Sequence, residues 1–251
     1  MKRSQTTPVL TVAATFVFAW LLTRTAWIEA SLKWMFPDEI SWLHTRADLA
    51  SLTLEHLAIV AISSGLTVLV GVPLGIWVTR RSGRDFRQLV AASVDLGQTF
   101  PPVAVLALAM PVLGFGFKPT IVALFLYGLF PVVSGTIAGL DAVPATTLEA
   151  AKGMGMSPLQ VLFRVELPLA ARVIMAGIRT SVVINIGTAT IGATIGTGGL
   201  GVPIIGGLAT RNMAYVVEGA LPAAVLAVLI DGLLGQVERG FAIPVSDVDT
   251  V

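Results

Sequence analysis

The chain has 251 residues, of which 55% are hydrophobic and only 12% are charged, and its formal net charge at pH 7 is +1. Soluble domains carry about a quarter charged residues, so this composition indicates a membrane protein. The near-neutral charge argues against a nucleic-acid partner, and the lack of cysteine, with only His44 and His56 as histidines, argues against disulfides and most metal sites.

Six predominantly apolar runs approach the length of about 20 residues that spans a hydrocarbon core. The first run follows Lys2 and Arg3 as a signal peptide would, but no small-x-small cleavage site follows Thr23, so we interpret it as a retained helix. The sequence therefore predicts an all-α polytopic membrane protein with about six transmembrane helices. The runs cover residues 8–23, 57–79, 88–114, 119–140, 173–195 and 216–237.

The basic residues between these runs predict the orientation, because cytoplasmic loops carry the excess of Lys and Arg. With the N-terminus inside, the inner segments hold the larger group, Lys2, Arg3, Arg80, Arg81, Arg84, Arg87, Lys152, Arg164, Arg172 and Arg239. The outer segments hold the smaller group, Arg24, Lys33, Arg46, Lys118 and Arg211. Both termini are therefore expected in the cytoplasm, and residues 24–55 form an external segment whose tryptophans, Trp27, Trp34 and Trp42, suit a membrane-interface belt.

Asp95, Arg179 and Asp231 lie inside predicted spans, each seven or eight residues from a basic residue that marks the cytoplasmic boundary. At 1.5 Å per residue, all three would lie roughly 10 to 12 Å deep. Charges inside a membrane tend to face the helix bundle and neutralise one another. We therefore predict that Arg179 pairs with Asp95, Asp231 or both, either to fix helix packing or to take part in gating.

The connection between the fourth and fifth runs, residues 141–172, carries ordered helix signals. Thr146 stands three residues before Glu149, which predicts a capping box at the start of a helix. Gly155 supplies the left-handed turn that would end this helix. The loop is therefore expected to contain a short helix and a glycine turn at the membrane's inner face.

A second helix is predicted directly after this turn. Ser157 and Gln160 form another capping box with Pro158 at the first helical position, and Pro168 would stop the helix or kink it into the next span. The loop also carries apolar residues that we expect to be exposed. An exposed apolar surface favours the interpretation that the loop docks on another protein, although a simple tether between spans is an alternative. The residues expected at this surface are Met154, Met156, Leu159, Val161 and Leu162, beside a smooth flank at Ala150 and Ala151.

The same loop resembles the EAA signature of ABC-importer permeases. The resemblance rests on Glu149-Ala150-Ala151, Gly155, Val165 and Leu167-Pro168 at the family's spacing, with Val165 where isoleucine is often found. It implies a type I ABC-importer permease fold in which the loop is a cytoplasmic coupling helix seated in a separate ATPase. The residues implied in coupling are Glu149, Ala150, Ala151, Gly155, Met156, Ser157 and Pro168.

A narrower resemblance, over roughly residues 52–236, is to the osmoprotectant permeases, which import glycine betaine, carnitine, choline or related quaternary amines. The first helix, the external segment and the Phe-Pro-Pro sequence are most similar to the low-affinity glycine betaine (Yeh-type) branch. The motifs are Leu54-Glu55-His56-Leu57, Val72-Pro73-Leu74-Gly75-Ile76, Gly97 to Pro102, Gly114 to Pro119, Gly177-Ile178-Arg179-Thr180, Asn185 to Thr190 and Gly198-Gly199-Leu200-Gly201.

These resemblances imply a multi-pass subunit of the bacterial inner membrane that works with several partners. The partners are cytoplasmic ATPase subunits, which would bind the ATP and magnesium, an extracytoplasmic substrate-binding protein, membrane lipid and a second permease. In the Yeh-type branch the second permease is a different chain, and an identical copy stays open. No cofactor, metal site or catalytic residue is expected in this chain.

A path for a quaternary ammonium solute needs neutral hydrogen-bonding groups and aromatic faces, which attract the cation through cation–π interaction. Prolines in such a span would break its hydrogen-bond ladder, as in transporter helices that open a cavity. Packing of helix against helix is an equally open interpretation of these polar residues. The candidates are Gln98, Thr99, Phe100, Pro101, Pro102, Asn185 and Thr188.

The chain lacks the G-x-x-x-x-G-K-[ST] phosphate loop, so it is not expected to hydrolyse ATP. Gly196, Gly198 and Gly201 fit G-x-G-x-x-G but follow a predicted span, which favours an extracellular turn over a dinucleotide site. The alternatives are a permease for another solute such as an amino acid or a sulfonate, an ATP-independent channel or secondary transporter, and a scaffold. We divide the chain into residues 1–51, a permease core at 52–236 and a cytoplasmic tail at 237–251.

Overall fold

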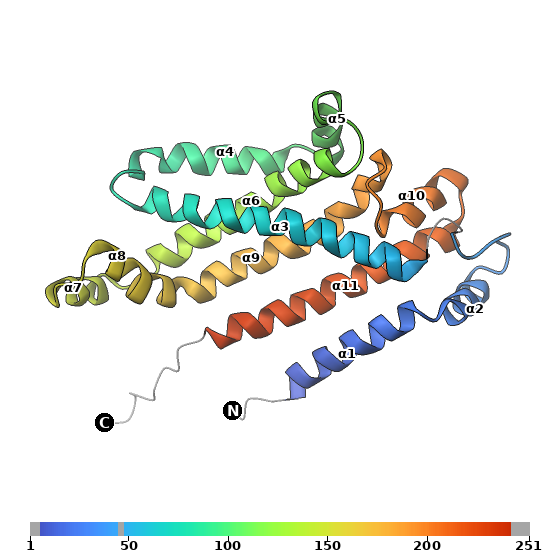
Figure 1. Ribbon diagram of the computed structural model, residues 1–251, viewed down its shortest axis with the longest axis horizontal. Coiled ribbons are helices and arrows are strands. Elements are labelled where there is room, and N and C mark those ends of the chain that lie inside the picture. Colours follow the sequence, from blue (N-terminus) through green and yellow to red (C-terminus); the bar gives the residue numbers. More distant parts are fainter. Residues whose placement is uncertain (1–5, 45–47, 242–251) are drawn as a thin grey trace.

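The computed structural model describes residues 6–44 and 48–241, and every regular element within them is a helix (Figure 1). The predicted all-α class is confirmed. The helices are α1 (Thr6–Leu22), α2 (Thr25–Met35), α3 (Leu49–Thr79), η1 (Arg84–Phe86), α4 (Arg87–Thr99), α5 (Pro102–Leu113), α6 (Phe117–Asp141), α7 (Ala145–Gly153), α8 (Pro158–Val161), η2 (Leu162–Glu166), α9 (Leu167–Ala189), η3 (Thr190–Ile195), α10 (Gly201–Thr210) and α11 (Met213–Gly240).

Within the described residues, α3, α6 and α11 are each long and apolar enough to cross a membrane. The number of such spans reaches five if each of two bent helix pairs counts as one. The predicted run at 173–195 corresponds to α9, whose 23 residues cover about 35 Å at 1.5 Å per residue while carrying Arg172 and Arg179. The predicted count of about six is compatible with these lengths.

The predicted run over 88–114 is broken at its prolines, as expected, and α4 and α5 meet there at an angle of 97°. Phe100 between them is extended, with ψ of 134°, since a residue before proline is pushed out of the helical region. Pro101 follows it, and Pro102 then occupies the first turn of α5. A second bend of 84° separates α1 from α2.

The centre of the bundle is built on close contact between α3, α6 and α9 (Figure 1). Small residues make this contact possible, as is usual for helices in membranes. A Cβ added to Gly177 of α9 would lie only 2.4 Å from the carbonyl oxygen of Pro131 in α6. A Cβ added to Gly75 of α3 would lie 2.7 Å from the Cβ of Thr136 in α6. The three helices therefore pack with their backbones close together.

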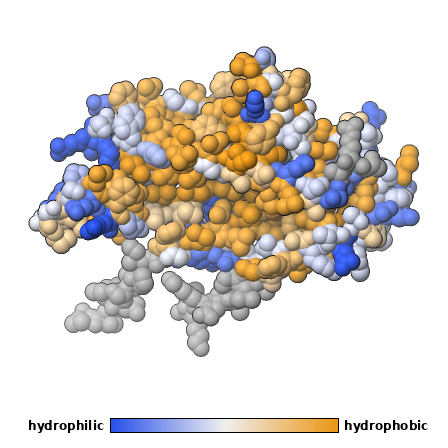
Figure 2. Space-filling view, in the orientation of Figure 1, coloured by the Kyte–Doolittle hydropathy of each residue, from blue (hydrophilic) through white to orange (hydrophobic). Residues whose placement is uncertain are grey.

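The long helices run between two ends of the molecule. Figure 1 shows α7 and α8 at one end, near the C-terminal end of α3, and α2 and α10 at the other. Figure 2 shows apolar residues over the middle of this face and hydrophilic residues mostly toward the two ends. The basic residues of the predicted inner loops that the structure describes lie at the α7–α8 end. Lys2 and Arg3 of the inner group, and Arg46 of the outer group, lie outside the described residues.

The predicted domain boundaries both fall inside helices. The division between residues 51 and 52 lies in the first turn of α3, which begins at Leu49. The predicted tail begins at residue 237, whereas α11 continues to Gly240. The three-part division stays a prediction.

Candidate translocation path and coupling loop

The loop between α6 and α9 begins with a helix and a glycine turn. The predicted capping box at Thr146 is wrong, because α7 already begins at Ala145 and no side chain caps it. The predicted left-handed turn is confirmed, since Gly155 has φ of +77°. The N–H of Gly155 donates to the carbonyl of Lys152 at 2.9 Å, and that of Met156 donates to the carbonyl of Ala151 at 3.2 Å. These two bonds form a Schellman motif, which ends α7 at a fixed angle.

The second helix of the loop begins as predicted and runs into α9. The side chain of Ser157 accepts from the Gln160 N–H, and the Gln160 side chain accepts from the Ser157 N–H, which completes the capping box. Pro168 does not stop the helix, because the preceding residues, η2, form a π turn in which the Leu167 N–H reaches back to Leu162. Such a turn relieves the clash of a proline ring with the preceding turn. The loop is therefore continuous with α9.

The exposed surface of the loop differs in part from the predicted one. Val161 and Leu162 are buried, and Leu162 packs into a cluster with the end of α6 and the start of α9. Ala151 is also buried, whereas Glu149, Ala150 and Gly155 are exposed. The exposed apolar side chains are Met154, Leu159 and Phe163, which are 73%, 67% and 64% exposed. The loop thus presents an apolar edge beside exposed Glu149, Ser157 and Pro168, with Met156 half-buried.

Two ion pairs join the base of the loop to the connection between α3 and α4. Nη1 of Arg80 lies 2.7 Å from Oε2 of Glu166, a buried residue of η2. Arg87 at the start of α4 pairs with Asp141 at the end of α6. Sequence reasoning missed both pairs, although acidic and basic residues on two loops of the same predicted side were a usable signal. The base of the loop is therefore tied to the end of α3 and the start of α4 as well as to α6 and α9.

The predicted path residues of α4 lie at the break before α5. Nε2 of Gln98 donates to the carbonyl of Tyr127 in α6 at 2.8 Å. That carbonyl has no helical donor, because Pro131 four residues later lacks an N–H. Thr99 bonds back to its own helix, and Phe100 is 51% exposed. Gln98 therefore joins α4 to α6, and Phe100 is the aromatic face available at the break.

The predicted path residues of α9 are placed differently. Asn185 is fully buried, and its Nδ2 donates to Oγ of Ser64 in α3 at 3.1 Å. Ser181 and Asn185 both approach Gly128 of α6, where a Cβ would lie 2.5 Å from the Ser181 hydroxyl oxygen. Asn185 therefore joins α9 to α3 and lies close to α6, which agrees with the helix-packing interpretation, and its place on the path stays a prediction. Thr188 is half-buried one turn further along.

An ion cluster connects α9 to α11. Nε and Nη2 of Arg179 each lie 2.5 Å from a carboxylate oxygen of Asp231, and Nη1 donates to Oε2 of Glu238 at 3.2 Å. A second cation, Arg172, lies 3.8 Å from the other Glu238 oxygen. The predicted pairing of Arg179 with Asp231 is confirmed. Glu238 was missed, although it follows Asp231 by two helical turns and so shares its face.

Asp95 does not join this cluster. It is exposed on α4, which packs against α6 and α3. The carboxylates that pair with Arg179, Asp231 and Glu238, both belong to α11, and α4 is not among the helices that pack closely against α9 or α11. Among the residues of 6–44 and 48–241 it has no ion pair. The predicted membership of Asp95 in the cluster is therefore wrong.

At the opposite end, two of the sequence motifs meet. Oε2 of Glu55 accepts from the N–H of Gly199 at 3.1 Å, and Gly198 and Gly199 both have positive φ. His56 is fully buried, and its Nε2 lies 3.0 Å from the carbonyl oxygen of Ile186. The glycines follow a helix rather than a strand, so the dinucleotide interpretation lacks the strand that it requires. Glu55 instead fastens the glycine turn to α3, and His56 joins α3 to α9.

The segment that is predicted to be external, residues 24–55, is held by the start of α11. Oε2 of Glu218 accepts from the backbone N–H of His44 at 2.8 Å, and Nδ2 of Asn212 donates to the carbonyl of Ser41 at 2.8 Å. Trp34 is 84% exposed, as expected for an interfacial anchor. Trp42 is only half exposed, and its indole N–H donates to the carbonyl of Phe36. The end that carries α2 and α10 is therefore closed by its own polar contacts.

No group of three or more histidine, cysteine or carboxylate side chains among the described residues is arranged to hold a metal ion.

Comparison with known proteins shows that the chain matches a family model and is similar to several named permeases. The family model described as binding-protein-dependent transport system inner membrane component matches residues 71–243. The choline transport system permease protein OpuBB of Bacillus subtilis is 45% identical over 187 residues, which are 74% of this chain and 85% of that protein. The osmoprotectant import permease protein OsmY of Salmonella typhimurium is 42% identical over 194 residues, which are 77% of this chain and 82% of OsmY.

Solved structures share the fold at lower sequence identity. An inward-facing form of the MetNI methionine ABC transporter matches with a TM-score of 0.69 and 23% identity, over 78% of this chain and 96% of the matched chain. An amino acid ABC transporter with histidines matches with a TM-score of 0.63 and 20% identity, over 76% of this chain and 93% of the matched chain. These likenesses concern the arrangement of the helices alone.

Proposed function

The chain belongs to the family of binding-protein-dependent transport system inner membrane components, and we propose that it forms the transmembrane path of an ATP-driven importer for an osmoprotectant, glycine betaine or a related quaternary amine. The named relatives OpuBB and OsmY carry choline or osmoprotectants, which supports this class of solute. The observation that carries the proposal is the coupling loop, an ordered helix, turn and helix with an exposed apolar edge and a braced base.

In this proposal the loop sits in a cytoplasmic ATPase subunit, and that subunit alone binds ATP and magnesium. Glu149, Ala150 and Gly155 are exposed and offer contacts, whereas Ala151 packs inward and sets the angle of α7. Met156 and Ser157 hold the turn between the two helices, and Pro168 lies in the first turn of α9. This chain is then a transport subunit without an ATPase site of its own.

The loop passes movement to the path through continuous structure. It joins α9 without a break at η2, and its base is tied to α3 and α4 through Arg80–Glu166 and Arg87–Asp141. The break at Phe100 is where α4 and α5 can change angle, because Pro101 and Pro102 interrupt the helix. We place the aromatic face of Phe100 on the path, where it meets the quaternary ammonium by cation–π attraction.

The ion cluster supports a water-filled or protein-covered inner half of the path. A cavity of about 310 Å³ borders Arg179, Asp231 and Glu238. The side chains of Arg179 and Asp231 are 33% and 39% exposed in the isolated chain. Charges exposed to hydrocarbon are costly, by about 2.5 to 3.5 kcal/mol each at a helix centre. The open side of the cluster therefore faces water or a second permease, whether a different chain or an identical copy, and not lipid.

The orientation in this proposal places the α7–α8 end and both termini in the cytoplasm, and the end with α2 and α10 outside, where a substrate-binding protein delivers the solute. The excess of basic residues at the α7–α8 end supports it. An ATP-independent channel or secondary transporter would leave the apolar edge of the loop uncovered.

The experiment is reconstitution of the chain with its ATPase, second permease and binding protein in vesicles, followed by uptake of labelled glycine betaine. The importer predicts uptake only when ATP and the binding protein are both present. Uptake that persists without ATP contradicts the proposal, and ATP-driven uptake of an amino acid or a sulfonate in place of betaine contradicts its solute class.

A further inference from the structure

Asp95 is a carboxylate inside the bent pair of α4 and α5, which together are long and apolar enough to cross a membrane. Within the part of the chain that the structure describes, its side chain has no ion pair and no hydrogen bond. It lies about 12 Å along α4 from Arg87, at 1.5 Å per residue, where contact with hydrocarbon is costly for a charge. The open side of Asp95 therefore faces water or a cation. The other carboxylates of α3, α6 and α11 are each paired or accept a hydrogen bond, and they are Glu55, Asp141, Glu218, Asp231 and Glu238.

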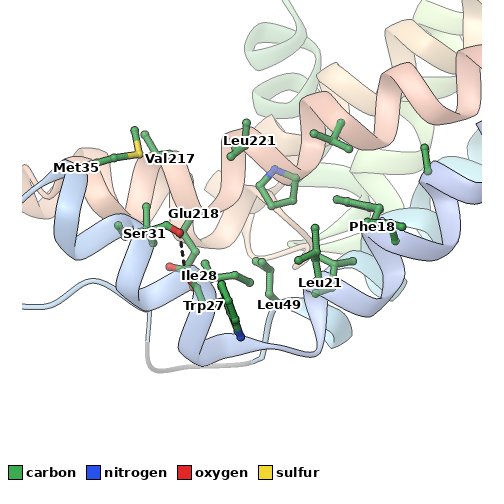
Figure 3. A pocket seen from close by; sticks show the side chains of 16 residues that line it. Phe18, Leu21, Trp27, Ile28, Ser31, Met35, Leu49, Val217, Glu218 and Leu221 are labelled. Carbon is green, nitrogen blue, oxygen red and sulfur yellow. Dashed lines mark hydrogen bonds between the residues drawn. The ribbon is translucent and has the colours of Figure 1, made fainter.

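The cavities of the chain do not offer an unpaired carboxylate of this kind. The cavity of about 480 Å³ between α1, α2 and α11 has an almost entirely apolar wall (Figure 3). Among the described residues that line it, Glu218 is the one with a charge, and its buried carboxylate accepts the His44 N–H. At the cavity of about 310 Å³ beside Arg179, both carboxylates are paired with that guanidinium. A cation therefore finds its unpaired carboxylate at Asp95.

The exposed surface of α4 has a polar side and an apolar side. Each residue advances about 100° around an α-helix, so Gln88, Asp95 and Thr99 share one side, and all three are exposed. Leu89 and Leu96 share the adjacent side and are 63% and 59% exposed. In a membrane the apolar side suits acyl chains, whereas the polar side suits water or protein. The polar side extends about 16 Å, from the first turn of α4 to the residue before the break.

This polar side leads to the break that the proposed function places on the path, and the inference rests on that function. Phe100 lies about 140° from Asp95 around the helix, so the two are separate contacts along the path. A quaternary ammonium group has no N–H to donate, so charge and aromatic faces attract it instead. A single carboxylate on an open surface attracts such a group without enclosing it, which lets the solute leave again. We propose that Asp95 lines the path and attracts the quaternary ammonium group of the solute.

The test measures the attraction of a quaternary ammonium reagent to this side of α4, and it needs neither ATP nor transport. The chain has no cysteine, so Thr99→Cys provides its single thiol, one turn from Asp95 on the polar side. The complex with the ATPase and the second permease is treated in vesicles with trimethylammonioethyl methanethiosulfonate or with its anionic counterpart, sulfonatoethyl methanethiosulfonate. Mass spectrometry of this chain gives the ratio of the cationic to the anionic modification rate. We expect Asp95→Asn to lower this ratio about tenfold, because attraction of the cation and repulsion of the anion are lost together.

Two control variants separate charge from packing and the polar side from the apolar side. Asp95→Glu keeps the charge and should keep the ratio. Leu96→Cys places the thiol on the apolar side, where acyl chains should slow both reagents about tenfold or more relative to Thr99→Cys. An unreactive thiol in Thr99→Cys, as expected if lipid or the second permease covers this side, would overturn the proposal. So would a ratio that is the same with and without the Asp95 carboxylate.

Uptake with ATP in the same vesicles distinguishes failure of this inference from failure of the proposed function. If the complex imports a quaternary amine but the ratio does not depend on Asp95, the importer stands and the role of Asp95 is wrong. If the ratio depends on Asp95 but no quaternary amine is imported, Asp95 attracts cations as proposed and the solute class is wrong.

Discussion

The two ends of the molecule differ in how their polar groups are paired and in which apolar side chains their loops expose. At the end with α2 and α10, polar groups are paired within the chain, as Glu55 is with Gly199 and Glu218 with His44. At the end with α7 and α8, the apolar side chains of Met154, Leu159 and Phe163 point away from the bundle core and are largely exposed. The chain segment at the first end is therefore held by contacts within the chain, although Trp34 and Ile40 there are 84% and 97% exposed, whereas the loop at the second end presents an apolar edge that a partner protein would cover.

This difference explains how a loop outside the spans can act on them. An apolar edge gains stability only when another surface covers it, and burial is worth about 25 cal/mol for each Å² of apolar area. The loop is not a loose tether, because the Schellman turn, the capping box and the Arg80–Glu166 pair fix its shape. A partner that moves the loop therefore moves α9 with it.

The largest effect on uptake is expected from Gly155→Pro, which disrupts the turn between α7 and α8. Proline fixes φ near −65°, whereas Gly155 has φ of +77° and donates its N–H to Lys152. We expect ATP-driven uptake to fall by roughly tenfold or more, since the loop loses about 3 kcal/mol of local stability. The control is Gly153→Ala, where an added Cβ meets no atom within 4 Å and the helix should tolerate it. Normal uptake by the proline variant would show that the turn does not couple.

The next effect concerns the ion cluster between the two ends. Arg179→Met leaves Asp231 and Glu238 without their main partner, and we expect a loss of about 1 to 3 kcal/mol, less than for a fully buried pair because the side chains are about a third exposed. Thermal unfolding of the purified complex measures it, and adding Asp231→Leu should recover part of the loss. Asp95→Asn is the matched control, and a loss equal to that of Arg179→Met would contradict the geometry.

Phe100→Ala tests the path itself. Loss of a cation–π contact worth about 0.5 to 2 kcal/mol should slow betaine uptake about two- to thirtyfold and leave complex assembly intact. The control is Phe16→Ala, an aromatic residue that is 73% exposed on α1, away from the break. Equal uptake kinetics in the two variants would remove Phe100 from the path.

The smallest effect on uptake is expected from substitutions of Glu218, at the end with α2 and α10. Glu218→Ala removes the acceptor of the His44 N–H, which should cost about 1 to 3 kcal/mol and loosen the external segment. Glu218→Gln keeps a carbonyl acceptor and should lose less. Hydrogen exchange of the backbone N–H of His44 measures the difference, and equal protection in both variants would show that this bond does not hold the segment.

Features that depend on neighbouring residues could be predicted from the sequence. Gly155, the Ser157 capping box and the long apolar helices follow from local spacing, and Arg179 with Asp231 follows from matched depth. The Thr146 capping box was wrong because Pro144 precedes α7 and the helix begins at Ala145, before the threonine can cap it.

Features that depend on contacts between distant segments could not be predicted. Glu55 lies 144 residues from Gly199, and nothing in either motif indicates the other. Asn185 resembles a path residue by type, but close contact between α3, α6 and α9 buries it against Ser64. The angle at Phe100 is likewise a property of the bundle, since the two prolines indicate only that the helix breaks.

The most direct test of the comparison uses the absence of cysteine from the chain. Leu159→Cys and Ile40→Cys each place a single thiol at one end, at positions that are 67% and 97% exposed. A maleimide that cannot cross membranes should label Ile40→Cys from outside intact cells and Leu159→Cys only in inverted vesicles, where the bound ATPase subunit should protect it. Labelling of Leu159→Cys from outside, or equal labelling with and without the ATPase subunit, would contradict the proposed coupling loop.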